Sequence, residues 1–429
     1  MSKGDLRTKY LLVGFSVASW WAAKAILDLE KDAEIVALSE EKECYSRPLI
    51  TYALGSKSEG VAYHGQVLKE VLNSVAVLWD TRAVKLWPEQ KKVELSDGRN
   101  VSFDKAFIGV GGVPILPPIP GIDLPGVFTF TRKKDMELLR SYLKEFGLKK
   151  VLVLGGGFIG LKTCEALLEM GLELTLVELA PRLLSNMLDE EGSSYLEEAL
   201  RNAGLKVIKE NTVSEFRAVR NRLGEVVLQS GERLSEEVAI VAIGVRPNVD
   251  WLSGSGVEID RGIVVDEFQM TSREDVYAGG DCAQTKNALT GEYGVVAIWP
   301  EAVAQSRVAG SNMAGKQVRY PGSIPMNSLE FGGMALVSAG LVNPRDARGF
   351  EVLVRKEKGI YKKIVLKDDR VVGIVLVGDI EKAGLFVYMM REQIPVTDFK
   401  DQLLAENFGL VSLPKNYRKH MVEGAGIEV

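Results

Sequence analysis

The chain has 429 residues, of which 46% are hydrophobic and 26% charged, and its formal net charge at pH 7 is -5. These values indicate a soluble globular protein of roughly two to four domains without the basic excess that nucleic-acid binding requires. Three cysteines at distant positions exclude a disulfide framework, and no Cys-x-x-Cys or Cys/His cluster provides a metal site. Only two histidines are present, which removes most acid/base and nucleophilic triads. We expect a reducing, cytoplasmic setting.

The first apolar segment is YLLVGFSVASWWAAKAIL, Tyr10 to Leu27, which follows several basic residues. It is long enough for a membrane anchor or a signal peptide, but Gly14 and the small residues after it interrupt the apolar run, and Lys24 lies within it. The charge-rich stretch DLEKDAE then leads directly into a second apolar run. The pattern therefore predicts a strand, a turn and a buried helix, with no membrane partner.

The segment KKVLVLGGGFIGLKTCEALLEMGLELTLVE repeats this layout downstream. A Gly-x-Gly-x-x-Gly turn stands between an apolar run and an amphipathic helix, and an acidic residue follows roughly twenty residues later, which together predict a dinucleotide site. The first glycine permits a tight turn, the second lets the backbone approach a pyrophosphate, and the third lets helix and strand pack closely. The acidic residue binds a ribose hydroxyl and repels a 2′-phosphate, so it favours NAD(H) over NADP(H). The predicted nucleotide-binding residues are Gly155, Gly157, Phe158, Ile159, Gly160 and Glu178.

Superposed on that copy, the N-terminal segment has one glycine and two serines where the downstream turn has three glycines. A serine at the second position adds a Cβ atom but also a hydroxyl that can bond a phosphate, so the pattern predicts an eroded second dinucleotide turn. Trp20 and Trp21 lie on the following helix and are predicted to pack in the core. The predicted binding residues of this copy are Gly14, Ser16, Ser19, Ser39 and Glu40.

Further motifs occur in order along the chain: CYSRPLITYALG, IGVGGVPILPPIPG, VAIGVRPNVDWL, VYAGGDCA, AIWPEAVAQSRVAGSNMAG and MNSLEFGGMALVSAGL. Together with the two turns they resemble the pyridine nucleotide-disulfide oxidoreductase superfamily, class I. Within it, the chain is similar to the branch of rubredoxin reductases, NADH oxidases and the nitrite reductase flavoprotein. The resemblance covers nearly the whole chain.

The resemblance implies an α/β fold with two Rossmann-like dinucleotide-binding domains, for FAD and NAD, and a C-terminal α+β interface domain. The FAD domain would comprise residues 1–115 and 245–322, the NAD domain residues 116–244, and the interface domain residues 323–429. The Pro-rich segment PILPPIPG and the segment IGVRPN would connect the first two domains. The interface domain would cover one side of the flavin or mediate association, as a homodimer or as a subunit of a redox complex.

The resemblance also implies roles for single residues. Asp281 would accept a ribityl hydroxyl of FAD, and the backbone N–H groups beside it would face the pyrophosphate. Pro300 would begin a helix whose N-terminus stabilises reduced flavin, and the Ser-Arg-Pro loop would lie beside the isoalloxazine. The residues that this adds to the predicted cofactor site are Arg47, Pro48, Gly111, Gly244, Gly280, Asp281 and Trp299.

Departures from the family pattern also bear on function. The Cys-x-x-x-x-Cys of disulfide reductases is absent, and Arg47 stands where NADH oxidases carry a cysteine. Cys44 lies three residues earlier without a cationic partner, which indicates an ordinary thiol. Lys162 replaces the glutamate that usually lies beside the nicotinamide. Lys162 and Arg47 are therefore the predicted catalytic residues.

We expect a cytoplasmic FAD-dependent NAD(P)H:acceptor oxidoreductase without a redox-active disulfide, which transfers hydride from NADH to flavin. The expected acceptor is a small iron–sulfur or rubredoxin-type carrier protein, with reverse flow where the carrier has a low potential. The alternatives are an NADH oxidase that reduces dioxygen and a non-catalytic nucleotide-binding subunit. The lysine-rich stretch between Arg355 and Arg370, which includes Lys362 and Lys363, is predicted either to attract an acidic carrier or simply to keep a sheet edge soluble.

Overall fold

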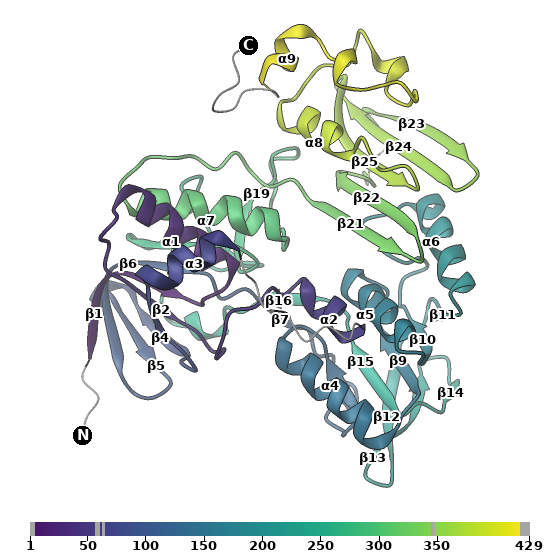
Figure 1. The fold of residues 1–429 in the computed structure, drawn as a ribbon, viewed down its shortest axis with the longest axis horizontal. Helices are drawn as coiled ribbons and strands as arrows, with labels where there is room; N and C mark the ends of the chain where they lie inside the picture. The colour runs from purple at the N-terminus through teal and green to yellow at the C-terminus, as the bar shows by residue number, and fades with distance from the viewer. Residues whose placement is uncertain (1–4, 56–60, 62–64, 345, 347, 421–429) are drawn as a thin grey trace. The chain divides into compact units, whose positions relative to one another are not determined.

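The computed structural model of the protein describes residues 5–55, 61, 65–344, 346 and 348–420, and Figure 1 shows its elements. The chain divides into two compact units. The first unit comprises Met1–Pro118, Gly126–Leu148 and Ile240–Ser323, and the second comprises Ile119–Pro125, Lys149–Ala239 and Ile324–Val429. The domain limits predicted from the sequence stay a prediction.

A seven-stranded sheet forms the centre of the first unit. Its strands are β1 (Leu6–Val13), β2 (Ile35–Leu38), β3 (Ala76–Leu78), β4 (Ala83–Trp87), β5 (Lys92–Leu95), β6 (Asn100–Ile108) and β18 (Val276–Ala278). Strands β3, β2, β1, β6 and β18 pair in parallel, whereas β5 and β4 continue from the first half of β6 as an antiparallel hairpin. The last four residues of β1 are all buried, as expected for a parallel strand covered on both faces.

Among the described residues, five helices belong to the first unit: α1 (Val17–Leu29), α2 (Leu49–Gly55), α3 (Gln66–Ser74), α4 (Lys133–Phe146) and α7 (Trp299–Met313). Helix α1 packs against α3 and α7, which lie beside it in Figure 1. A Cβ atom on Gly310 of α7 would lie 2.3 Å from the carbonyl oxygen of Ala22, so glycine permits this close packing. Trp20 is 1% exposed and lies in the core, as predicted.

Short elements complete the first unit. They are β7 (Gly112–Pro114), β8 (Val127–Thr129), β16 (Val245–Pro247), β17 (Ile263–Val264), β19 (Ala283–Lys286), β20 (Tyr293–Gly294), η1 (Pro88–Gln90) and η2 (Asp250–Leu252). Strands β7 and β16 pair antiparallel at the predicted crossing segments. Strand β19 pairs with β17 in parallel and with β20 antiparallel.

The first part of the second unit contains the downstream copy of the glycine turn. Its elements are β9 (Lys150–Leu154), α5 (Phe158–Glu169), β10 (Glu173–Val177), α6 (Glu190–Asn202), β11 (Lys206–Ile208), β12 (Val213–Val219), β13 (Arg222–Leu228), β14 (Arg233–Leu234) and the first half of β15 (Val238–Val241), whose last two residues are assigned to the first unit. Strands β9, β10 and β11 pair in parallel, and β12, β13 and β14 form a separate antiparallel sheet.

The C-terminal part of the second unit is a five-stranded antiparallel sheet of order β21-β22-β25-β24-β23 followed by short helices. The elements are β21 (Met326–Phe331), β22 (Met334–Gly340), β23 (Phe350–Glu357), β24 (Ile360–Lys367), β25 (Arg370–Val377), α8 (Ala383–Arg391), η3 (Lys400–Gln402), η4 (Leu410–Ser412) and α9 (Lys415–His420). Helix α8 packs against β25 and β22.

The predicted α/β class with two Rossmann-like sheets and an α+β C-terminal part is confirmed. The N-terminal apolar segment forms β1, a turn at Gly14 and α1, as predicted. None of the helices in the described residues combines the length and the apolar character that crossing a membrane requires.

Candidate functional site

The turn after β1 is shaped by Gly14. Its φ angle is +91°, and a Cβ atom there would lie 2.6 Å from the carbonyl oxygen of Gly109 in the loop after β6. Ser16 is the N-cap of α1 with an extended backbone (φ -129°, ψ -166°), and its hydroxyl makes no capping hydrogen bond to the described residues. Because the first N–H groups of a helix lack intrahelical partners, this turn is suited to hold a phosphate.

The buried side chain of Ser19 stabilises this turn. It is 0% exposed, and its hydroxyl donates a hydrogen bond to the carbonyl oxygen of Gly14. The hydroxyl is thus used within the protein, and the predicted contact of Ser19 with a cofactor stays a prediction.

Two further loops meet this turn from the ends of neighbouring parallel strands. Gly280, which follows β18, has a φ angle of +78°, and an added Cβ atom would lie 3.2 Å from the Cβ of Ala18 in α1. The N–H of Gly279 donates to the carbonyl oxygen of Ile108 at 3.2 Å, and Sγ of Cys282 lies 3.4 Å from the same oxygen. The loops after β1, β6 and β18 therefore converge at the N-terminus of α1, where parallel α/β sheets bind ligands.

Asp281 and Arg47 share one electrostatic environment beside these loops. Burial raises the pKa of the Asp281 carboxyl, and the positive charge of Arg47 opposes that rise. Nη1 of Arg47 also donates to the carbonyl oxygen of Thr131 at 3.5 Å, while the neighbouring Pro48 is exposed. The charge of Arg47 thus acts on the Asp281 carboxyl, and the predicted contacts of Asp281, Arg47 and Pro48 with a cofactor stay predictions.

The residues after β2 are tied to the start of α4. Ser39 is 3% exposed, and its Oγ accepts a hydrogen bond from the N–H of Glu41 at 3.2 Å. Glu40 forms an ion pair of 3.2 Å with Arg132, which precedes α4. Glu40 is the second residue after β2, whereas Glu178 is the first residue after β10. The carboxylate near the predicted ribose position is therefore shifted by one residue between the two copies.

The remaining predicted residues of the first unit lie at its helix and strand termini. Trp299 is the first residue of α7 and lies edge-on to Trp20, with ring centroids 6.3 Å apart and an interplanar angle of 69°. Gly111 and Gly244 have φ angles of +66° and +118° at the ends of the crossing strands β7 and β16. Their carbonyl oxygens each accept a backbone hydrogen bond of 3.0 Å.

The glycine turn of the second unit shows why Gly155 and Gly160 are glycines and leaves open space beside Gly157. Gly155 has a φ angle of +112°, and a Cβ atom on Gly160 would lie 2.0 Å from the Gly155 carbonyl oxygen. Gly157 is the N-cap of α5, and no described atom lies within 4 Å of a Cβ added there. Phe158 is 39% exposed in the first turn of α5, and Ile159 after it is half-buried. The turn is tightly packed between Gly155 and Gly160 and has open space beside Gly157, where a pyrophosphate could approach the helix N-terminus.

Glu178 stands beside this turn, directly after β10. Its Oε2 accepts a hydrogen bond from the N–H of Gly156 at 2.5 Å, and its Oε1 accepts one from the N–H of Ala180 at 2.7 Å. Two backbone donors thus hold the carboxylate at the strand end, where the adenosine ribose of a dinucleotide is expected.

Lys162 lies inside α5 and is 5% exposed. Its Nζ forms an ion pair with Glu165 one turn later in the same helix. The positive charge is therefore compensated within the helix, and the catalytic role of Lys162 stays a prediction.

The cofactors implied by the two turns fit the residues that are present. In the first unit, Gly14 stands where a Cβ atom cannot fit, and Ser16 leaves a helix N-terminus available for the pyrophosphate of FAD. In the second unit, the open space before Gly157 and the carboxylate of Glu178 fit NAD(H). The residues predicted for FAD belong to the first unit and those predicted for NAD(H) to the second, and their contacts with a cofactor stay predictions.

All three cysteines lie in the described residues and are free thiols. Burial raises the pKa of Cys44 to about 12, although a hydrogen bond with the Trp20 side chain lowers it in part. Burial also raises the pKa of Cys282 to about 12 and that of Cys164 further still. These thiols are protonated at neutral pH, so they lack the thiolate that nucleophilic cysteine chemistry requires.

Lys362 and Lys363 are not the exposed charges that the predicted attraction of an acidic carrier requires, whereas Lys356, Lys358 and Lys367 are exposed and the role of the stretch as a whole stays a prediction. Lys362 and Lys363 are 6% and 8% exposed and form ion pairs with Asp379 and Asp189. Both lie on β24, which is paired on both edges and buried over most of its length. Because each of these two lysines is paired with a carboxylate, neither adds net positive charge that could attract a partner.

Three residues that shape the first unit were missed by the sequence analysis. Gly109 makes room for Gly14, Arg132 pairs with Glu40, and Gln305 of α7 accepts a hydrogen bond from the N–H of Gly280 at 2.8 Å. Gly109 stands among the glycines of IGVGG, and a single glutamine on a helix carries no local signal. Only the contacts across the fold identify them.

Comparison with known families agrees with this geometry. Residues 8–306 match the family described as pyridine nucleotide-disulphide oxidoreductase, and residues 325–394 match the rubredoxin NAD+ reductase C-terminal domain. The chain belongs to the pyridine nucleotide-disulphide oxidoreductase family, an NAD(P)H-dependent group of flavin oxidoreductases with FAD and NAD(H) as cofactors.

Individual relatives are similar over most of the chain. The chain is 30% identical over 415 residues to the NADH-dependent phenylglyoxylate dehydrogenase subunit epsilon of Aromatoleum evansii, covering 94% of this chain and 96% of that protein. It is 27% identical over 404 residues to the nitrite reductase [NAD(P)H] of Bacillus subtilis, covering 91% of this chain but only 48% of that protein. A ferredoxin reductase structure from Rhodopseudomonas palustris is 26% identical with a TM-score of 0.79, covering 89% of this chain and 93% of that one.

Proposed function

We propose that the chain is an FAD-dependent NADH:acceptor oxidoreductase whose acceptor is an iron–sulfur or rubredoxin-type carrier protein. The observation that carries the direct transfer of electrons is that Cys44, in the loop that also holds Arg47, is a free thiol whose pKa burial raises to about 12. Family members that use a thiol need a thiolate beside the flavin, and this loop offers none. Electrons therefore leave the cofactor directly for an external acceptor, without a redox-active disulfide.

The residues of the chain bind and orient the reactants. The N-terminus of α1 with Ser16 holds the FAD pyrophosphate, Asp281 accepts a ribityl hydroxyl, and Arg47 holds the isoalloxazine. The turn at Gly157 and the carboxylate of Glu178 hold NADH. FAD held by these residues would supply the chemistry of accepting a hydride from NADH and passing electrons on to the acceptor.

Two similarities support a protein acceptor. The C-terminal part matches a domain named for rubredoxin reductase, and the whole chain is similar to a ferredoxin reductase. The relative from Aromatoleum evansii is named as one subunit of an NADH-dependent dehydrogenase, which supports a place in a larger redox complex. With a carrier of low potential, the same arrangement runs in reverse and reduces NAD+.

An anaerobic titration tests the proposal. The purified protein is mixed with NADH under argon, the flavin absorbance is followed, and oxidised ferredoxin or rubredoxin is then added. We expect bleaching by NADH and reoxidation coupled to carrier reduction. Rapid reoxidation by air with no transfer to either carrier would identify an NADH oxidase. A colourless protein that stays empty after incubation with FAD would identify a nucleotide-binding subunit without catalysis.

A further inference from the structure

A row of buried polar side chains begins at the turn that precedes Asp281. The N–H of Gly280 donates to Oε1 of Gln305 at 2.8 Å, and Nε2 of Gln305 donates to Oγ1 of Thr285 at 3.5 Å. Gln305 is 0% exposed and Thr285 is 2% exposed. The carboxamide of Gln305 therefore connects the backbone of this turn to β19.

The row continues to a carboxylate in the first turn of α7. Oγ1 of Thr285 and Oγ of Ser323 are 2.7 Å apart, and Oγ of Ser323 lies 3.0 Å from the hydroxyl of Tyr320. That hydroxyl donates to Oε2 of Glu301, which is 2% exposed. Burial and then the charge of Glu301 raise the pKa of Tyr320, so the phenol keeps the proton that it donates. The row is a continuous hydrogen-bonded chain from Gly280 to Glu301.

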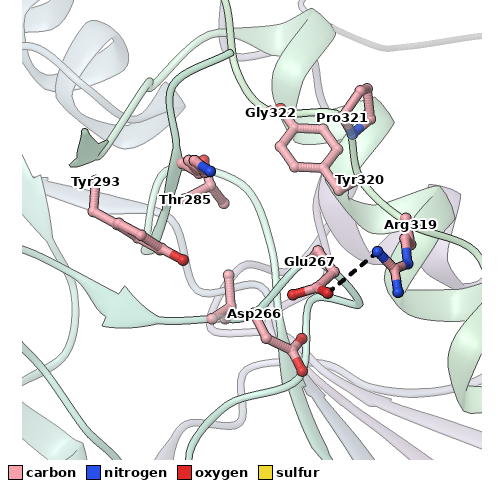
Figure 2. A pocket seen from close by; sticks show the side chains of 10 residues that line it. Asp266, Glu267, Thr285, Tyr293, Arg319, Tyr320, Pro321 and Gly322 are labelled. Atoms are coloured by element: carbon pink, nitrogen blue, oxygen red, sulfur yellow. Dashed lines mark ion pairs between the residues drawn. The ribbon is translucent and has the colours of Figure 1, made fainter. Parts of the chain in front are cut away.

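Two residues of this hydrogen-bonded row, Thr285 and Tyr320, also line a pocket of about 410 Å³. Figure 2 shows Thr285 and Tyr320 at its wall, together with Tyr293 and the ion pair between Glu267 and Arg319. The pocket touches this row of hydrogen bonds at Thr285 and Tyr320, so the hydroxyl of Tyr320 can be removed without changing the turn at Gly280. Tyr293 lines the same pocket but is 44% exposed, and no hydrogen bond connects its hydroxyl to the described members of the chain.

Gly280 is buried, so its N–H needs a hydrogen-bond partner within the protein. It lies between Ala18 of α1 and Ala302 of α7, where an added Cβ atom would be 3.2 Å and 3.5 Å from their Cβ atoms. A buried N–H without a partner is costly, so the turn would rearrange if Gln305 were lost. Asp281 follows directly, and any rearrangement would move its carboxylate.

We propose that Gln305 is a positioning residue that holds the Gly280–Asp281 turn in its FAD-binding conformation before FAD arrives. Thr285, Ser323, Tyr320 and Glu301 fix the orientation of its carboxamide. The inference rests on the assignment of this turn to FAD in the proposed function. Preorganisation of this kind acts on affinity because the free protein no longer has to be ordered when the cofactor binds.

The test compares the affinity of apoprotein variants for FAD. Q305M keeps the length of the side chain but removes the acceptor for Gly280, and we expect the dissociation constant to rise by about tenfold. Y320F removes the hydroxyl that joins Ser323 to Glu301, and it should raise the FAD dissociation constant by a smaller factor. Y293F removes a hydroxyl from the same pocket without touching the chain and should leave FAD affinity unchanged.

Two further measurements on the apoprotein separate positioning from a general loss of structure. Hydrogen exchange should accelerate in the peptide that spans residues 276–283 of Q305M, and the affinity for NAD+ should not change. Equal FAD affinity of Q305M and the unmodified protein overturns the inference, as does exchange that accelerates throughout the first unit. If the unmodified protein binds no FAD, the proposed function fails, but exchange of the apoprotein peptide still tests the bond between Gln305 and Gly280.

Discussion

The hydroxyl of Ser19 donates a hydrogen bond to the carbonyl oxygen of Gly14. In the second unit, Gly160 and Gly155 have the same spacing, and a Cβ atom on Gly160 would lie 2.0 Å from the Gly155 carbonyl. The turn of the second unit thus excludes any side chain at Gly160. The turn of the first unit has Ser19 at the equivalent position, and the serine hydroxyl has a hydrogen-bond partner there. Ser19 is therefore compatible with a nucleotide-binding turn, because its hydrogen bond to the Gly14 carbonyl replaces the close packing that Gly160 makes on the Gly155 carbonyl.

Removal of that hydroxyl should weaken FAD binding. A buried hydrogen bond contributes about 0.5–1.5 kcal/mol net, so we expect S19A to raise the FAD dissociation constant by about two- to tenfold. S306A is the matched control, because Ser306 is also 0% exposed and its hydroxyl has no hydrogen-bond partner among the described residues. Fluorescence titration of the two apoproteins with FAD measures the difference, and equal affinities would show that the Ser19 hydroxyl has no part in the turn.

Asp281 should contribute more than Ser19, because its carboxylate is charged. A hydrogen bond to a charged group is worth about 1.5–3 kcal/mol, so D281A should lose about ten- to a hundredfold in FAD affinity. D104A, at an exposed aspartate on β6, serves as the control. The flavin that remains bound after gel filtration gives the readout, and full retention by D281A would remove this residue from the site.

The parts of this structure that the sequence predicts are those set by local chemistry. The positive φ angles at Gly14 and Gly155 follow from glycine turns between apolar runs, and the strands follow from the runs themselves. Lys362 was misjudged because its burial depends on the order of strands in the sheet. Gln305 was missed because its partner is 25 residues away and is a backbone N–H. Such contacts leave no periodic pattern in the chain.

Glu178 should determine the choice of nucleotide. Its carboxylate at the end of β10 repels a 2′-phosphate, so NADH should reduce the flavin faster than NADPH at subsaturating concentration. E178Q removes the charge and should lower the NADH preference by at least about fivefold, since a like-charge contact of about 4 Å costs about 1 kcal/mol even in water. E173Q changes an exposed glutamate at the start of the same strand and should leave the preference unchanged. Stopped-flow reduction with each nucleotide provides the rates, and identical preferences in both variants contradict the assignment.

Cys44 should be dispensable for electron transfer. Its thiol is protonated at neutral pH because burial raises its pKa to about 12. We expect C44S to reduce an artificial dye with NADH at a rate within about twofold of the unmodified protein. A large loss of activity, with the FAD content unchanged, would restore a thiol relay and refute direct electron transfer from the flavin.

Asp189 gives the second unit a carboxylate whose protonation affects stability. Its Oδ1 caps α6 by accepting the N–H of Gly192 at 3.0 Å, and its Oδ2 accepts the hydroxyl of Tyr361 at 2.6 Å and pairs with Lys363 at 2.9 Å. Burial alone would raise the pKa of Asp189, but the hydrogen bonds from Tyr361, Lys363 and Gly192 outweigh it, and the pKa lies below its ordinary value of 3.8. The folded state therefore favours the ionised form.

A group with a depressed pKa in the folded state stabilises the protein above its unfolded pKa and loses that contribution as the pH falls. D189N keeps a good helix cap but removes the charge opposite the buried Lys363, and at pH 7 we expect a loss of about 3 kcal/mol in the free energy of unfolding. The difference between D189N and the unmodified protein should shrink as the pH falls through and below 3.8. E191Q removes the partner of Lys356 in an exposed pair beside the same helix start and should cost at most about 1 kcal/mol. Thermal unfolding of the three proteins from pH 7 to pH 3 measures these differences, and a D189N effect that is the same at every pH would show that the cap geometry matters and the charge does not.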